Sequence, residues 1–273
     1  MHRGDLDLVS FSARAGERDG TLFEATFARA IVQPDGRAID IAGTPLESVA
    51  KYGFYTFNID VYIDEDRVQG SGRTDTLPGR KAEIDPSSAW EQAVVLAPRP
   101  IEARNQLVRL WIAAAKRERE ARKETLDSEE ARVLERSVER EVDARVFFPT
   151  RIRVSGPKIE FFVPGSFFGG NVASPTWGYV VAVTGADITR KFDIPALLGR
   201  AVSPDEGVMN LGIGPGYSQE QFGGGRELDP LQPPLVDIIV PPGRTQEEVL
   251  RRTSSDKGRP VRLPGVVPAE AAR

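Results

Sequence analysis

Apolar and polar side chains alternate without a break over residues 57–64. The apolar positions are Phe57, Ile59, Val61 and Ile63, and the polar ones are Asn58, Asp60, Tyr62 and Asp64. A period of two is typical of a β-strand that buries one face, because successive side chains point to opposite sides of a sheet. The pattern therefore predicts a strand whose second face is polar and exposed, with two carboxylates and a tyrosine in a row.

Further short apolar stretches, separated by Gly and Pro, predict more strands. They lie at residues 6–13, 21–30, 90–96, 147–154, 158–163, 178–184 and 235–240. Between two of them, Ser155-Gly-Pro-Lys158 is typical of a hairpin turn, since Gly allows positive φ and Pro fixes its own φ. Many short strands with such turns favour an all-β fold, a two-sheet antiparallel β-sandwich.

Residues 102–142 follow a different pattern, with no Gly or Pro and a high density of Ala, Arg, Lys and Glu. Helical spacing relates two sets of apolar residues: Leu107, Leu110, Trp111 and Ala114, and then Val133 or Leu134, Val138 and Val142. Such spacing is typical of amphipathic helices. We expect a charged α-helical hairpin inserted in the sandwich at about 102–145. A break is expected near residues 125–128, where Ser128 is the candidate cap of the second helix.

Two interpretations of this hairpin stay open. Its basic and acidic residues nearly cancel, which fits a solvated hairpin on its own sheet, held by i,i+4 pairs worth about 0.2–0.5 kcal/mol each. The same features fit an arm that docks onto another protein or an anionic surface. In that case Leu107, Trp111 and Val138 are the candidate contacts.

The remaining parts of the chain look less regular. Residues 187–234 are rich in Gly and Pro, and we expect long ordered loops there, where binding sites on rigid scaffolds usually lie. Residues 253–273 carry few apolar side chains and three spaced prolines, which predicts an extended tail that is mobile unless a partner orders it. The expected organisation is one sandwich domain over residues 1–252, including the hairpin, followed by this tail.

Composition excludes several classes of protein. A net charge of -4 gives no general attraction to the phosphate backbone, so we expect no nucleic-acid partner. No apolar run reaches the roughly 18 residues of a membrane-spanning helix. The chain has no cysteine, which removes disulfides, thiolate zinc sites and cysteine nucleophiles.

The residues give little support to catalysis. The one histidine, His2, lies next to the N-terminus, which argues against Ser-His-Asp catalysis and histidine metal sites. Asp60 and Asp64 on one strand would lie about 13 Å apart, farther than the roughly 5–9.5 Å between the two carboxyl groups of glycosidases. We therefore expect a protein that is not an enzyme and needs no catalytic cofactor.

Calcium is the most credible ion, because it binds oxygen ligands that Asp side chains at the end of a strand can supply. Asp60, Asp64 and Asp66 are the candidate ligands of a structural Ca²⁺. The competing interpretation is an acidic turn that is only solvated.

Sugar binding needs exposed aromatic faces with hydrogen-bonding groups beside them. Tyr62, on the polar strand face, and Tyr217, in a Gly-rich loop, are the best-placed candidates. Trp177 and Tyr179 are further candidates, although they share a strand face with two valines and equally suit a core.

Several segments resemble, in their order along the chain, the C-terminal β-sandwich module of glucodextranase and its relatives. The clearest are Tyr52–Asp64 near the start, and Phe222–Gly225 followed by Val236–Gln246 near the end. Further segments are Leu6–Phe11, Leu22–Phe27, Pro78–Ala82, Ala89–Glu91, Ile159–Pro164, Thr176–Tyr179 and Thr184–Asp187. The resemblance covers roughly residues 4–252 and departs at the charged insertion. This β-sandwich module is similar to type 9 carbohydrate-binding modules and DOMON-like domains.

The resemblance implies a non-catalytic binding module that attaches to carbohydrate or to the cell envelope, outside the cytoplasm, at the cell surface or in the periplasm. Similar sandwich modules also hold a structural calcium ion between strand ends. Residues 1–5 lack the apolar core of a signal peptide, so either the protein is cytoplasmic or its signal is not present in this sequence; the resemblance favours the second alternative. The alternative function is a structural accessory subunit of a larger membrane-associated or surface protein assembly, docked through the helical insertion and the tail.

Overall fold

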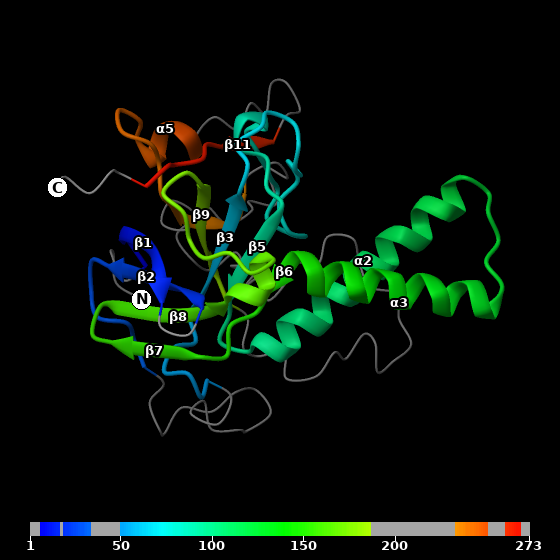
Figure 1. The fold of residues 1–273 in the computed structure, drawn as a ribbon, viewed down its shortest axis with the longest axis horizontal. Helices are drawn as coiled ribbons and strands as arrows, with labels where there is room; N and C mark the ends of the chain where they lie inside the picture. The colour runs from blue at the N-terminus through cyan, green and yellow to red at the C-terminus, as the bar shows by residue number, and fades with distance from the viewer. Residues whose placement is uncertain (1–5, 17–18, 34–49, 187–232, 251–259, 269–273) are drawn as a thin grey trace, which may run out of the picture.

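The computed structural model of the chain describes residues 6–16, 19–33, 50–186, 233–250 and 260–268. These residues form two large sheets, one small sheet and a projecting pair of helices (Figure 1). The four-stranded sheet is antiparallel, in the order β1 (Leu8–Gly16), β2 (Gly20–Phe27), β8 (Lys158–Pro164) and β7 (Ile152–Ser155). The five-stranded sheet has the order β10 (Leu235–Ile238), β9 (Gly178–Gly185), β3 (Phe57–Asp64), β5 (Gln92–Leu96) and β6 (Val146–Phe147).

A first hydrophobic core joins the two large sheets. Phe23 and Phe161 of the four-stranded sheet stack with their ring centroids 5.3 Å apart. They belong to the same buried cluster as Ile59 and Val181 of the five-stranded sheet, and all four side chains are fully buried. These inward positions are the apolar ones of each alternating pattern, so the β-rich, sandwich-like fold is as expected.

A second core covers the opposite face of the five-stranded sheet. It combines Tyr62, Ala93 and Val95 of that sheet with Leu107 and Leu263 from outside it. Every residue of β3 is buried as a result. The prediction of an exposed polar face on this strand is therefore wrong, because a further layer of structure covers that face.

The small sheet supplies part of this covering layer. Strand β4 (Ala82–Ile84) pairs in parallel with β11 (Val261–Leu263), and the two apolar ends of β11 are buried. Val266 then exchanges two backbone hydrogen bonds with Tyr179 on β9, both at 2.8 Å. Part of the expected tail, residues 260–268, therefore packs against the sandwich.

Two helices connect β5 to β6. They are α2 (Pro100–Ala121) and α3 (Ser128–Arg145), which confirms the charged hairpin and the position of its break. Because the hairpin carries the chain out and back on one side, β6 returns parallel to β5, a departure from a purely antiparallel sheet.

The start of α3 differs from the prediction by one residue. Asp127, rather than Ser128, is the N-cap, and its side chain accepts hydrogen bonds from the backbone N–H groups of Glu129 and Glu130, each at 2.8 Å. The Glu130 carboxylate accepts in return from the backbone N–H of Asp127 at 3.0 Å. Such a capping box stabilises a helix end by about 1 kcal/mol.

Short helices complete the described structure. They are α5 (Gln246–Leu250) and two 3₁₀ turns, η1 (Pro86–Ser88) and η2 (Gly165–Phe168). Among the described residues, none of the helices has the length and apolar character needed to cross a bilayer.

Candidate functional site

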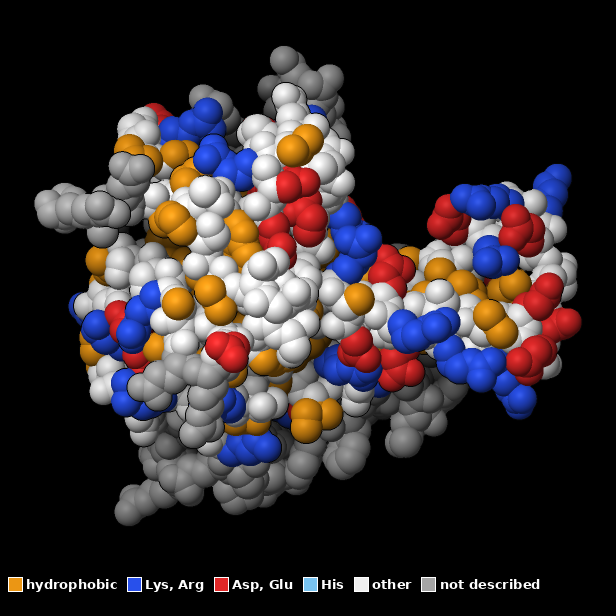
Figure 2. All heavy atoms as spheres, in the orientation of Figure 1, with side chains coloured by type: hydrophobic (Ala, Val, Ile, Leu, Met, Phe, Trp, Pro, Cys, Tyr) orange, Lys and Arg blue, Asp and Glu red, His pale blue; other side chains and the backbone are white. Residues whose placement is uncertain are grey.

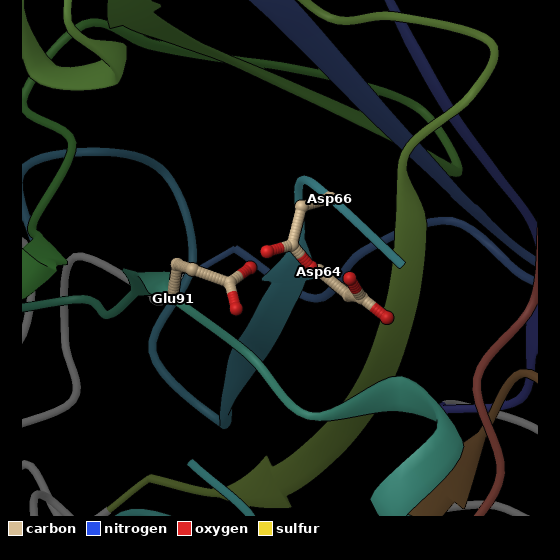
Figure 3. A group of neighbouring side chains, drawn as sticks. All are labelled: Asp64, Asp66 and Glu91. Atoms are coloured by element: carbon tan, nitrogen blue, oxygen red, sulfur yellow. The ribbon is translucent and has the colours of Figure 1, made fainter. Parts of the chain in front are cut away.

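Three carboxylates gather where β3 ends and β5 begins (Figure 3). Asp64 is the last residue of β3, Asp66 lies in the turn that follows, and Glu91 immediately precedes β5. The antiparallel register pairs Ile63 with Gln92, which brings Glu91 beside the end of β3. One oxygen from each carboxylate lies within 4.8 Å of the other two.

Hydrogen bonds hold these carboxylates in place. Asp64 accepts from the backbone N–H of Arg67 at 2.6 Å, and Asp66 accepts from that of Val68 at 2.8 Å and from the Ser71 hydroxyl at 2.9 Å. Glu91 accepts from the backbone N–H of Glu65 at 2.8 Å. These bonds fix the turn and aim several acidic oxygens at one small space.

The cluster is electrostatically strained. Burial raises the pKa of Asp64 and that of Glu91, and the charge of Asp66 raises both further. Burial also raises the pKa of the adjacent Glu65, with Glu91 as the second cause. A divalent cation among these groups would offset their negative charges and relieve the repulsion. The spacing fits such an ion, because two oxygens that each lie about 2.4 Å from one Ca²⁺ are at most about 4.8 Å apart.

Calcium binding stays a prediction. Its candidate ligands are now Asp64 and Asp66, which the sequence suggested, and Glu91, which the fold adds. At a Ca²⁺ concentration 100 times the dissociation constant, we expect a gain of about 2.7 kcal/mol in unfolding free energy and a rise of about 5–10 °C in Tm. Thermal unfolding in EGTA and in millimolar Ca²⁺ measures this. Glu91→Gln should shrink the rise, whereas Glu83→Gln, a change at a half-buried carboxylate on β4, should leave it unchanged. Equal Tm values in both buffers would show a solvated acidic turn.

Asp60 takes no part in this cluster, which corrects its assignment as a calcium ligand. Its carboxylate is 1% exposed and forms a two-point ion pair with Arg80, with Nε–Oδ2 at 2.6 Å and Nη2–Oδ1 at 3.0 Å. Because both of its oxygens bond the buried guanidinium, the Asp60 carboxylate is not available as a ligand of Ca²⁺.

Tyr62 is equally removed from solvent, so its expected role in stacking on a sugar is ruled out by its position. Its side chain is 1% exposed, packs 5.5 Å from the Trp90 ring, and its hydroxyl accepts from the backbone N–H of Leu77 at 3.0 Å. Burial, followed by the nearby charge of Asp60, raises the pKa of this phenol well above its usual value.

The other aromatic candidates divide into three cases. Trp177 is 5% exposed and packs 5.2 Å from Phe168, so the core interpretation fits it. Tyr217 lies outside the described residues. Tyr179 is 3% exposed, but it lines a groove on the surface, and its buried hydroxyl has no hydrogen-bond partner among the described residues. Burial raises the pKa of that hydroxyl, and the charge of Glu65 contributes.

The groove lies at one open side of the sandwich, where β1 and β10 are the outer strands of their sheets. It measures about 430 Å³. Its walls are Phe11, Ser12 and Ala13 of β1, Tyr179 of β9, Ile239, Val240 and Pro242 after β10, and Val266, Val267 and Pro268. Asp237 on β10 accepts a hydrogen bond from the backbone N–H of Leu8, which ties the two outer strands together. Burial raises the pKa of Asp237 to about 6.

The residues expected to contact a docking partner instead anchor the hairpin. Leu107 is fully buried in the second core and Val138 is 6% exposed. The half-buried Trp111 faces Arg73, whose guanidinium carbon lies 4.8 Å from its ring centroid and 5.5 Å from that of Trp90. Arg73 also reaches Glu141 of α3 at 3.5 Å, so it links both helices to the sandwich.

Sequence reasoning missed Phe11, Glu91 and Arg80. Phe11 sits in a strand that was predicted, but the groove beside it depends on residues more than 160 positions away, such as Tyr179. Glu91 follows Trp90 in a segment that was assigned to the core, and only the strand register brings it to Asp64. A lone basic residue such as Arg80 gives no local signal of burial.

Comparison with known proteins agrees with the fold. A family model described as the C-terminal, SLH-like binding module of glucodextranase matches residues 1–265. No curated protein matches the chain. The family match spans the helical insertion and the β11 segment as well as both large sheets, and on this evidence the chain belongs to the family of SLH-like C-terminal binding modules of glucodextranase.

Proposed function

We propose that this protein is a non-catalytic module that binds carbohydrate of the cell envelope, outside the cytoplasm, through the groove between β1 and β10. Membership of a family of SLH-like binding modules is the observation that supports it most. The groove adds a place for the ligand, since a binding site is a concave, largely apolar surface with a few polar groups.

The chemistry of the groove fits the edge of a sugar chain. Phe11 is half-buried and offers an aromatic surface for the C–H face of a pyranose ring. The hydroxyl of Ser12 supplies a polar group on the same wall. Aliphatic and proline side chains form the rest of the lining.

Phe11→Ala should weaken retention on insoluble envelope polysaccharide at least tenfold, because the variant loses the aromatic surface of the groove. Phe162→Ala is the matched control: Phe162 is a half-buried aromatic residue on the outer face of the same sheet, and it does not line the groove. Affinity electrophoresis with extracted polysaccharides, with a thermal melt of each variant, measures the effect.

Tyr179→Phe is a second control in the same assay. Removing an unpartnered buried hydroxyl should leave both the unfolding free energy and the retention nearly unchanged, because this oxygen is not accessible from the groove. Retention that is equal in the wild type, the Phe11 variant and the Phe162 variant would remove the groove as the binding site.

The alternative function, a structural subunit of a surface assembly, rests on the helical hairpin. Its outer part projects from the sandwich and carries no buried side chain. The tail adds less to this alternative, because residues 261–263 pair within the sandwich.

A further inference from the structure

The α2–α3 hairpin anchors only its inner half on the sandwich. The buried residues of α2 end at Leu110, and those of α3 begin at Val138. Trp111 still packs against the second core, and none of the 26 residues from 112 to 137 is buried. We call residues 112–137 the arm, and Figure 1 shows it extending well beyond the sheets.

The arm is poorly stabilised by its own contacts. Helical segments of about ten residues are marginal in water unless an apolar face packs on something. Lys116 pairs with Glu135 between the helices at 2.7 Å, but both side chains are about two-fifths exposed, and such pairs contribute only about 0–1 kcal/mol. The arm therefore has little packing of its own, and a partner surface would add stability to it.

Apolar side chains follow the arm. Val133 is 50% exposed, and Ile112, Ala131 and Leu134 are each partly exposed. Figure 2 shows apolar side chains along the arm with basic and acidic groups beside them. An apolar strip with a charged margin is the usual composition of a protein–protein contact, with an apolar centre and a polar rim.

The charges of the arm are self-complementary. Residues 116–124, at the end of α2 and in the turn that follows it, carry five basic and three acidic side chains, a net charge of +2. Residues 127–136, at the start of α3, carry four acidic and two basic ones, a net charge of -2. A uniformly acidic or basic partner would be repelled by one of the two helices. A second copy that is related by a two-fold axis places each helix beside the oppositely charged helix of its partner.

The arm is long enough for a second copy to pack along it. It has 26 residues, and because only one face of each helix contacts a second copy, the interface would be at the small end of the usual range. Two arms packed side by side would form a four-helix bundle in which the apolar strips face each other.

We propose that the arm is a dimerisation element: two copies of this chain pack their arms antiparallel about a two-fold axis, with the two sandwiches at opposite ends. The dimer presents two binding grooves on one rigid body, which increases the avidity for a repetitive surface without any new contact in either groove. The inference does not depend on what the groove binds.

Sedimentation velocity of the full chain between about 1 and 100 µM tests the proposal. We expect a species of twice the monomer mass of 29.9 kDa. Val133→Glu should weaken the dimer at least tenfold, because it places a charge in the apolar strip. Val68→Glu is the matched control, since Val68 is 57% exposed on the sandwich and lies outside the arm. Circular dichroism checks that both variants keep their helices.

The absence of cysteine permits a direct distance measurement. A spin label on Ser137→Cys, an exposed position of α3, should report an intermolecular distance of roughly 20–40 Å, from 1.5 Å of rise per residue and 8–10 Å between packed helices. A monomer at 100 µM, a dimer that is insensitive to Val133→Glu, or a monomer whose arm captures a different protein would each overturn the proposal.

Discussion

Replacing Asp60 with alanine should lower the free energy of unfolding by about 3–5 kcal/mol, the effect expected when one member of a buried ion pair is removed. Asp60 and Arg80 are each 1% exposed, and two hydrogen bonds join them. The variant would leave the buried guanidinium without its carboxylate. Urea titration followed by tryptophan fluorescence measures the loss.

The double variant Asp60→Leu/Arg80→Met separates the value of the pair from the penalty of an orphaned charge. It buries neither charge, and we expect it to recover most of the loss, because apolar replacements of buried ion pairs are often neutral or better. Lys158→Ala is the control for an exposed pair, because Lys158 contacts Glu24 at 2.7 Å across neighbouring strands. This substitution should lower the free energy of unfolding by less than about 1 kcal/mol. A single Asp60 variant as stable as the Lys158 variant would show that the buried pair is not formed.

The polar face of β3 shows where local pattern stops being informative. Alternation over residues 57–64 correctly identifies the strand and the side chains that face the first core. It says nothing about a second layer made by β4, β11 and the base of the hairpin, which come from three separate parts of the chain. The buried Asp60 needs Arg80, and Tyr62 needs the backbone of Leu77; these partners exist only after the layer is assembled.

The helical insertion was predictable because its signals are local. A run without Gly or Pro, apolar residues at helical spacing and a polar break are all contained within about 45 residues. The neighbouring Asp127 and Ser128 are both good N-caps, which explains the error of one residue. The sequence could not show which apolar residues of the hairpin are buried, because Leu107 and Val138 have the same apolar character whether they anchor a helix or contact a partner.

The candidate sites follow the same division between local and distant signals. Asp64 and Asp66 lie two residues apart and were found from the sequence, whereas Glu91 enters the cluster only through the register of β3 and β5. The groove requires β1, β9, the residues after β10 and the segment after β11 to meet. Short apolar segments such as Val261–Leu263, with a charged residue at their centre, carry too little pattern to predict that meeting.

Leu107→Ala is expected to cost about 2–5 kcal/mol of unfolding free energy, the range for removing a buried leucine side chain from a packed core. Leu107 is fully buried in the cluster that holds Val95, Val142 and Val146, so the residue joins α2, α3 and the five-stranded sheet at one point. The cavity cannot close easily, because three elements would have to move together.

The matched control for this change is Ile101→Ala on the same helix, since Ile101 is 59% exposed and should change stability by less than about 0.5 kcal/mol. Hydrogen exchange adds the spatial result. Loss of the Leu107 anchor should speed exchange in α2, α3 and β6 together, while β2 and β8 of the other sheet stay protected. Equal protection of the hairpin in both variants would mean that contacts along the arm, rather than its buried base, hold the two helices in place.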